Sequence, residues 1–211
     1  MNVADIMDQG KTLLVSLSKG ELGEERSAFF GTVIVSLIQL ATYARARQPE
    51  ADRRDFFVYV DEFQNFATSH FTDLFSESRK FHVFFIPTHQ SIAQIDDSKT
   101  ASIISGNAGT IIALKSGPDD EAFILPFMAP EVEKGQVVNL SPHHFFMKVT
   151  NGVSEDSFSG ETIQITKEGT ESLAEEIIRS SRERYATPKL EVEAQLALLC
   201  NWYLKSDLIT G

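Results

Sequence analysis

The sequence predicts an α/β protein with a doubly wound, mostly parallel sheet. Three apolar runs have the length and composition of strands, and segments with helical periodicity separate them; the runs are FFVYV at 56–60, FHVFFI at 81–86 and GTIIALK at 109–115. Parallel strands need such crossover segments, because a tight turn cannot return the chain to the same end of the sheet. The run at 56–60 shows no alternation and is flanked by charge, which indicates a strand buried on both faces.

The first elements follow in order along the chain. Residues 12–17 (TLLVSL) are expected to form a strand that pairs in parallel with 56–60, and 56–60 is expected to pair in parallel with 82–86. A long helix is expected over about 24–47, because its apolar residues recur at every third or fourth position. A second helix is expected over about 71–80.

Helices also surround the third apolar run. A short helical region ends near Gly106, a residue type typical of the position after a helix. Another helix begins at Pro118, where a proline is followed by Asp119, Asp120 and Glu121. Proline and acids in the first turn suit the unpaired N–H groups and the dipole of a helix start.

The character of the sequence changes near residue 136. Asn151-Gly152 lies between two strand-like runs, which is typical of a β-hairpin, and two helices are expected over about 169–185 and 188–204. We therefore expect three regions: an α/β core at 1–135, a hairpin extension at 136–167 and C-terminal helices at 168–211.

Composition narrows the classes of function. The formal charge is −11, from 30 acidic and 19 basic residues, which argues against a wide nucleic-acid-binding face on this segment. The single cysteine, Cys200, excludes an internal disulfide and suits a reducing compartment. The N-terminus has no signal-peptide pattern, and no apolar run approaches the ~20 residues that a bilayer requires. We expect a cytoplasmic segment without direct membrane contact.

One short motif resembles a phosphate-binding loop but does not match the full P-loop pattern. Gly10-Lys11-Thr12 matches the end of G-x-x-x-x-G-K-[ST], but the first glycine would have to stand at Asp5. A P-loop also lies between a strand and a helix, whereas the expected strand follows this motif. No other GK[ST] occurs in the chain. The sequence therefore contains no recognisable P-loop.

The strongest chemical signal is FFVYVDEFQNF, where Asp61 and Glu62 follow the expected strand at 56–60. Ligands bind at the carboxyl ends of strands in open α/β sheets. In P-loop ATPases the first such acid holds the Mg²⁺ that bridges the phosphates, and the second polarises the attacking water. We assign these roles to Asp61 and Glu62. The structural alternative is that the two acids only end a strand and cap the next helix.

Two further segments supply candidate residues. The next strand ends in IPTHQ, where Gln90 is the first choice and Thr88 the second for a group that binds the γ-phosphate or the attacking water. Alternatively, Thr88 or Ser91 caps a helix and Gln90 is solvated. Arg79, in SESRKF, is a candidate arginine finger for a neighbouring subunit; alternatively, it complements the dipole at the end of its helix.

The order of these motifs resembles the HerA/FtsK-type ATPases, and most closely the conjugative coupling proteins of type IV secretion (TraG/TraD-like). The quoted motifs cover roughly residues 5–190, in the order in which that family has them. The resemblance implies a RecA-like fold and a ring-forming, usually hexameric, DNA-translocating motor. Asp61 and Glu62 then match the Walker B pair, Gln90 the polar sensor and Arg79 the arginine that acts in trans, with ATP and Mg²⁺ as cofactors.

The chain departs from that family in lacking the P-loop strand and the membrane anchor. It is therefore expected to be the C-terminal portion of a motor domain, either as a fragment, as a truncated reading frame or as half of a split motor. The expected partners are the missing N-terminal half, DNA and secretion-system or relaxosome proteins. Alone it is expected to bind no nucleotide tightly and to be inactive. Such motors place the P-loop strand between 82–86 and 109–115, so either these strands close up, which we expect, or a gap remains. A scaffold or partner-binding module derived from the motor is the alternative function.

Overall fold

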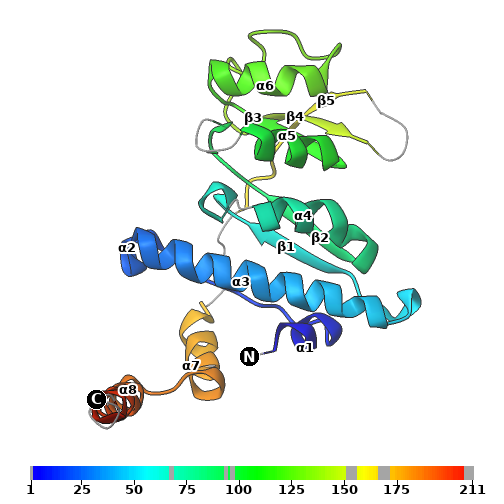
Figure 1. Cartoon of the computed structure of the whole chain (residues 1–211). Coiled ribbons are helices and arrows are strands. Elements are labelled where there is room, and N and C mark those ends of the chain that lie inside the picture. Colours follow the sequence, from blue (N-terminus) through cyan, green and yellow to red (C-terminus); the bar gives the residue numbers. More distant parts are fainter. Residues whose placement is uncertain are drawn as a thin grey trace. The chain divides into compact units, whose positions relative to one another are not determined.

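The computed structural model describes residues 2–66, 69–92, 95, 98–150, 156–165 and 172–206. The chain divides into two compact units, Asn2–Ile163 and Gln164–Gly211. All the strands and the helices α1 to α6 belong to the first unit, and α7 and α8 belong to the second (Figure 1).

The first unit begins with the short helix α1 (Val3–Asp8), which ends at the GKT motif. Gly10 has φ +63°, and the N–H groups of Gly10 and Lys11 donate to the carbonyls of Met7 and Ile6. This pattern is the Schellman motif, in which a left-handed glycine closes a helix. Gly10 therefore terminates a helix and does not open a phosphate loop.

The strand expected at 12–17 is wrong, because residues 11–18 form no strand. Leu14 and Val15 are exposed, and the carbonyl of Leu17 accepts a hydrogen bond from the Ser27 hydroxyl at 2.7 Å. An apolar run becomes a strand only where a neighbouring strand pairs with its backbone. This run instead leads into α2 (Lys19–Leu22).

The long helix is confirmed as α3 (Glu24–Ala44), extended by the 3₁₀ turn η1 (Arg45–Arg47) and followed by η2 (Glu50–Asp52). Contrary to the sequence expectation, this helix is long and apolar enough to span a membrane by length and composition, with a mean hydropathy of 1.5. The core helix of a soluble protein meets the same criterion. Here one side of α3 packs into the core through Val35, Ile38 and Ala41.

The central parallel pair is confirmed. β1 (Phe56–Val60) pairs in parallel with β2 (Val83–Pro87), from Phe56 opposite Val83 to Val60 opposite Pro87. The crossover consists of η3 (Phe63–Phe66), α4 (Ser69–Glu77) and η4 (Ser78–Phe81). These elements place the ends of β1 and β2 at the same edge of the sheet.

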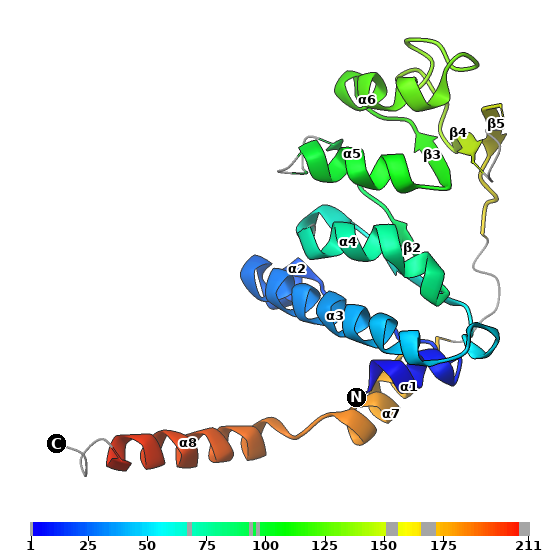
Figure 2. The ribbon, with the colours of Figure 1, turned by 45° about the vertical axis from the view of Figure 1, so that its right-hand side comes forward.

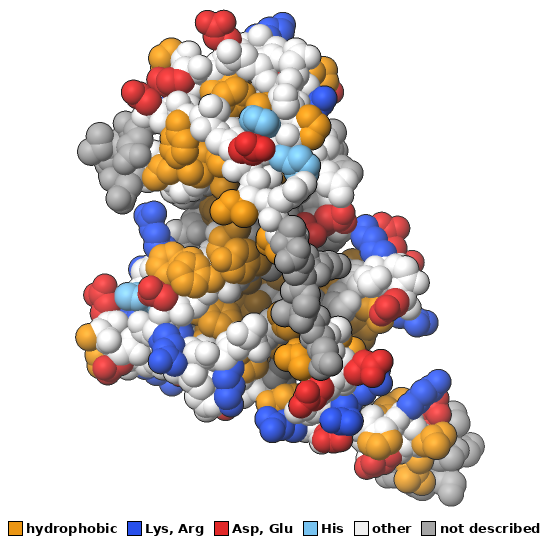
Figure 3. All heavy atoms as spheres, turned by 180° about the vertical axis from the view of Figure 1, so that it is seen from behind, with side chains coloured by type: hydrophobic (Ala, Val, Ile, Leu, Met, Phe, Trp, Pro, Cys, Tyr) orange, Lys and Arg blue, Asp and Glu red, His pale blue; other side chains and the backbone are white. Residues whose placement is uncertain are grey.

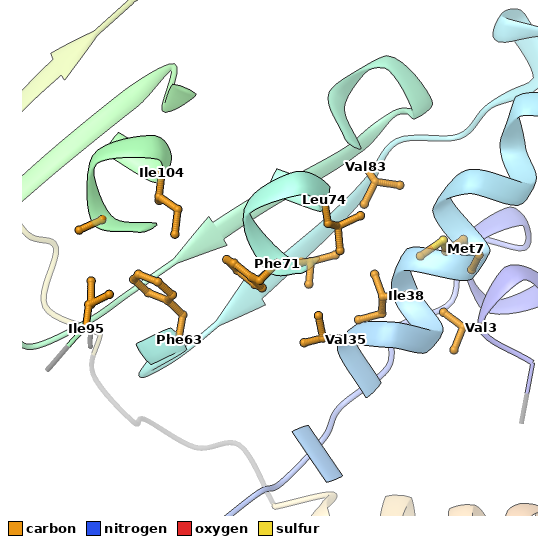
Figure 4. Close-up of a cluster of buried hydrophobic side chains, with 13 residues drawn as sticks. Val3, Met7, Val35, Ile38, Phe63, Phe71, Leu74, Val83, Ile95 and Ile104 are labelled. Carbon is orange, nitrogen blue, oxygen red and sulfur yellow. The ribbon is translucent and has the colours of Figure 1, made fainter. Parts of the chain in front are cut away.

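The core covers only one face of this pair. Val58 is 8% exposed, whereas Phe57 and Tyr59 are 55% and 76% exposed, so the expectation of a strand buried on both faces is wrong. Alternate side chains of a strand point to opposite faces, and only the Val58 face meets helices. The core side chains come from α1, α3, α4, α5 and both strands (Figure 4), and α3, α4 and α5 lie in a row (Figure 2).

The third apolar strand belongs to a separate sheet. α5 (Ser98–Asn107) leads to β3 (Thr110–Leu114), and α6 (Pro118–Met128) leads to the antiparallel hairpin β4 (His144–Val149) and β5 (Phe158–Glu161). The sheet order is β3-β4-β5, all antiparallel. The antiparallel pairing of the hairpin is confirmed, whereas its turn at 151–152 lies outside the described residues.

Two expectations about the sheet are therefore wrong. The described strands do not form one mostly parallel sheet, and β3 does not close up against β2. The hairpin strand β4 satisfies one edge of β3 instead, a pairing that the sequence analysis did not anticipate.

The second unit contains α7 (Ala174–Tyr185) and α8 (Lys189–Ser206). Both helices lie close to their expected ranges. Ile177 and Ile178 of α7 are each 49% exposed.

Candidate functional site

The candidate site lies at the carboxyl ends of β1 and β2. Asp61 follows the last residue of β1, and Thr88 follows the last residue of β2. Because the two strands are parallel neighbours with Val60 opposite Pro87, these two residues meet at one edge of the sheet. The sequence placed four candidates here, Asp61, Glu62, Thr88 and Gln90, and hydrogen bonds join them in two pairs.

The first pair is Asp61 and Thr88. The hydroxyl of Thr88 donates to Asp61 Oδ1 at 2.6 Å, and the backbone N–H of Glu62 donates to the same oxygen at 3.1 Å. Backbone bonds fix Thr88 as well, since its N–H donates to Val60 and its carbonyl accepts from Phe63. The Asp61 carboxylate is thus held by a rigid strand end.

The second pair is Glu62 and Gln90. Glu62 has φ +47°, an uncommon conformation for a residue other than glycine, which His82 and His143 also adopt. The side-chain amide of Gln90 donates to Glu62 Oε1 at 2.8 Å. Gln90, the candidate sensor, and Glu62, the candidate for activating the water, are therefore in direct contact.

Asn65 is a site residue that the sequence analysis missed. Its side-chain amide donates to the Glu62 carbonyl at 3.0 Å and lies 3.4 Å from Glu62 Oε2. The asparagine three residues after the glutamate was the available signal, but its contact depends on the 3₁₀ turn η3. Asn65 and Gln90 hold the two carboxylate oxygens of Glu62 from different elements.

The segment that follows Thr88 is anchored by aromatic and polar contacts. The His89 ring meets Phe63 edge to face, with centroids 5.5 Å apart. Partial burial lowers the pKa of His89 below its ordinary value of 6.5, and the negative charge of Asp120 opposes this shift. Asp120 accepts a hydrogen bond from the backbone N–H of Ile92 at 2.6 Å.

Arg79 lies away from this edge. It is an exposed residue of η4, immediately before β2, and therefore at the amino end of the strand whose carboxyl end carries Thr88. A five-residue strand spans ~16 Å at about 3.3 Å per residue. Arg79 is not brought together with Asp61, Glu62, Thr88 or Gln90.

The oxygen donors of the site suit Mg²⁺. A carboxylate and a hydroxyl at one strand edge are hard ligands, and Mg²⁺ at phosphate sites uses one or two carboxylates together with waters and phosphate oxygens. No group of three or more His, Cys, Asp or Glu side chains that could hold a metal occurs in the described part of the chain. Asp61, with Thr88 beside it, would hold the ion, which supplies charge neutralisation at the phosphates.

Three solved structures were found to be similar to this chain. The bacterial conjugative coupling protein TrwBdeltaN70 matches with a TM-score of 0.50 and 15% identity, over 63% of this chain and 36% of that one. TrwB in complex with the GTP analogue GDPNP matches with a TM-score of 0.47 and 15% identity, over 67% of this chain and 37% of that one. The chain thus spans just over a third of the length of these coupling proteins.

A further structure comes from Sulfolobus turreted icosahedral virus 2. Its genome packaging NTPase B204, in complex with AMPPCP, matches with a TM-score of 0.49 and 14% identity, over 78% of this chain and 73% of that one. No curated protein matches the chain in sequence.

The fold is similar to that of a conjugative coupling protein, and a family match covers part of the chain, as the order of motifs indicated. Residues 55–124, which contain the whole site, match the family described as the TraM recognition site of TraD and TraG. The chain is therefore TraG/TraD-like, and the resemblance seen in the sequence is confirmed.

Proposed function

We propose that this chain is the C-terminal segment of a DNA-translocating motor ATPase of the conjugation coupling class. It supplies the Walker B and sensor side chains and lacks the phosphate-binding loop. The observation that carries the proposal is the double contact at one strand edge, Thr88 with Asp61 and Gln90 with Glu62. In a chain whose residues 55–124 match the TraD and TraG family, these are the groups that a phosphoryl-transfer site requires.

Each side chain has a separate task in this proposal. Asp61, oriented by Thr88, binds the magnesium ion that accompanies ATP. Glu62 accepts the proton of the attacking water, and Gln90 and Asn65 orient its carboxylate. Both oxygens of Glu62 are engaged by amides in the structure, so the water must replace or join one of these donors. A carboxylate has about four acceptor sites, so a water can bind Glu62 beside the amides of Gln90 and Asn65.

The phosphate cradle would come from a strand placed between β2 and β3. Among the described strands, each of these two has a ladder partner on one side only, β1 for β2 and β4 for β3. Unpaired backbone groups cost ~1–3 kcal/mol each once buried, so two such edges favour pairing with a further strand. The strands at 82–86 and 109–115 thus leave a gap between them, which was the second of the two possibilities. The gap supports a missing N-terminal motor half as the partner.

The exposed face of the sheets supports the same partner. Phe57, Tyr59, Ile112 and Leu114 are each more than half exposed, with fractions of 55%, 76%, 58% and 54%. Hydrophobic side chains gather on this side of the molecule (Figure 3). Parallel sheets are covered on both faces, so further helices are expected to cover Phe57 and Tyr59 on the parallel pair β1 and β2.

The remaining partners follow from the proposed class, the conjugation coupling ATPases. We propose DNA as the substrate of the complete motor, a homohexameric ring as its assembly and relaxosome or secretion-system proteins as its contacts, as the TraM recognition description suggests. With a net charge of −11, this segment would contact DNA through few residues and not through a wide basic face. A cytoplasmic location, with any membrane tether outside this segment, belongs to the same proposal.

The alternative is a catalytically inactive scaffold that keeps the fold and binds a partner. The exposed apolar face is compatible with it. The paired site residues favour the motor, because a scaffold has no need of two acids that are each held by a side chain from the end of the next strand.

The test joins a P-loop-bearing coupling-protein segment to the 211-residue chain and measures ATP hydrolysis. The wild-type product should hydrolyse ATP, whereas Glu62→Gln should lose at least about a hundredfold in turnover, as removal of a general base does, and keep nucleotide binding. Asp61→Asn should weaken the magnesium dependence as well. A joined protein that assembles and binds ATP but shows no Glu62-dependent turnover would favour the scaffold.

A further inference from the structure

Asp120 ties the segment after β2 to the helix α6. The carboxylate is only 6% exposed and lies in the first turn of α6. Its Oδ1 accepts hydrogen bonds from the backbone N–H of Ile92 at 2.6 Å and from the hydroxyl of Ser91 at 3.2 Å. A buried carboxylate needs such donors, so this contact fixes two elements that are far apart in the sequence.

Gln90 lies between two anchored points of this segment. On one side Thr88 is fixed by its bonds to Val60 and Asp61, and on the other Ser91 and Ile92 are fixed by Asp120. Gln90 itself is exposed, and the bond to Glu62 is made by its side chain. Short anchored segments restrict the backbone, and the position of Gln90 thus depends on both anchors.

We propose that Asp120 is a positioning residue for Gln90. By holding Ser91 and Ile92, it keeps the Gln90 amide against Glu62 and makes the geometry of the candidate site depend on the helix that follows β3. Movement of α6 relative to β2 then changes the contact between Gln90 and Glu62. The catalytic meaning of this contact rests on the proposed function, whereas the positioning itself does not.

Glu121 provides a matched control. It is the next residue of the same helix turn and is also buried, at 4% exposure. Its carboxylate accepts from the N–H groups of Gly135, Val137 and Val138, at 2.9 to 3.2 Å, and thus holds the loop after α6. Two adjacent carboxylates therefore anchor two different loops, and only the Asp120 loop carries Gln90.

The experiment measures amide hydrogen exchange and the Gln90 side-chain NH₂ resonances by NMR in the 211-residue chain, without nucleotide. Asp120→Ala should speed exchange at Ile92 by roughly tenfold or more, the loss expected for a hydrogen bond to a charged group. It should also move the Gln90 resonances towards their positions in Glu62→Ala, where the acceptor is gone. Glu121→Gln should speed exchange at Val137 and Val138 and leave Gln90 unchanged.

The proposal is overturned if the Gln90 resonances stay at their wild-type positions in Asp120→Ala, or if Glu121→Gln moves them equally. Should Asp120→Ala fail to fold, Ser91→Ala, which removes the weaker of the two bonds to Asp120, must produce the same shifts at smaller size. Since no nucleotide is present, this result is independent of ATP hydrolysis. A positioning role without catalysis would leave the NMR result intact and abolish only the proposed function.

Discussion

Arg45 is a charged residue that is nevertheless buried, with only 2% of its surface exposed. Its Nη1 donates to the carbonyls of Arg54 at 2.8 Å and Phe81 at 3.1 Å, and its Nη2 lies 3.2 Å from Asp8. These groups come from the segments that precede β1 and β2 and from α1. One guanidinium therefore fixes the edge of the sheet opposite the candidate site.

Arg45→Ala should lower the free energy of unfolding by about 1–3 kcal/mol, because it leaves the partly buried carbonyl contacts to Arg54 and Phe81 without their donor. Asp8 keeps its hydrogen bond from Gln48. Urea unfolding of the purified chain measures this change. Arg47→Ala is the control, since Arg47 is exposed and should change the value by less than about 0.5 kcal/mol. Equal losses in the two variants would contradict the structural role of Arg45.

Sequence reasoning succeeded for residues whose position follows from strand ends. Asp61 and Thr88 could be placed together, since the ends of adjacent parallel strands always meet. Asn65 and Asp120 could not, because their contacts depend on the shape of a 3₁₀ turn and on the distance between a loop and a helix. The acids of α6 were expected to stabilise only their own helix, yet two of them are bonded to other segments.

At the scale of elements, α6 and the loop after it form a pH-sensitive contact. The N–H of Gly135 donates to the Glu121 carboxylate and lowers its pKa below the ordinary 4.5; burial opposes this shift, and the N–H groups of Val138 and Val137 add to it. At a pH near the ordinary pKa of 4.5, Glu121 therefore carries a proton less often in the folded chain than in the unfolded chain. The resulting stability is present above pH 4.5 and is lost as the pH falls through the lowered pKa.

Glu121→Gln should remove this part of the acid sensitivity. In the wild type, exchange at residues 135–138 should rise as the pH is lowered from about 6 towards 3, after correction for the intrinsic pH dependence of exchange. The variant should show fast exchange at every pH. Asp119→Asn, which alters an exposed acid in the same turn, should behave as the wild type; a flat wild-type profile would refute the prediction.

The elements that were predicted wrongly share one physical cause. Helices form from local periodicity, and α3, α4, α7 and α8 lie close to their expected ranges. A strand depends on a distant partner, which the local pattern does not reveal. Residues 12–17 have strand composition without a partner, and β3 pairs with β4 instead of β2.

At the scale of the whole molecule, Arg79 lies at the opposite end of the parallel strand pair from Asp61 and Glu62. An arginine in that position does not reach the site of its own chain, but in a ring it could face the neighbour's γ-phosphate. In the assembled motor, Arg79→Ala should abolish turnover while folding and nucleotide binding persist, since arginine fingers contribute ~10³–10⁵ in turnover. Arg79→Lys should rescue poorly, because an ammonium does not match the guanidinium fork.

Mixed rings test the trans role of Arg79. Combining Arg79→Ala subunits with Glu62→Gln subunits should restore some turnover, because some interfaces then join an intact Arg79 to an intact Glu62. A mixture that stays inactive while its subunits demonstrably exchange would remove the support for this role.

The central claim is that this chain holds one half of an ATPase site, and ATP turnover by the purified 211-residue chain tests it most directly. Phosphoryl transfer depends on positioning and electrostatic stabilisation, and no P-loop amides or lysine are present in the sequence to provide them. We therefore predict no hydrolysis above background, with or without Mg²⁺. Magnesium-dependent turnover that disappears in Glu62→Gln would show that the chain holds a complete site, and would contradict the claim.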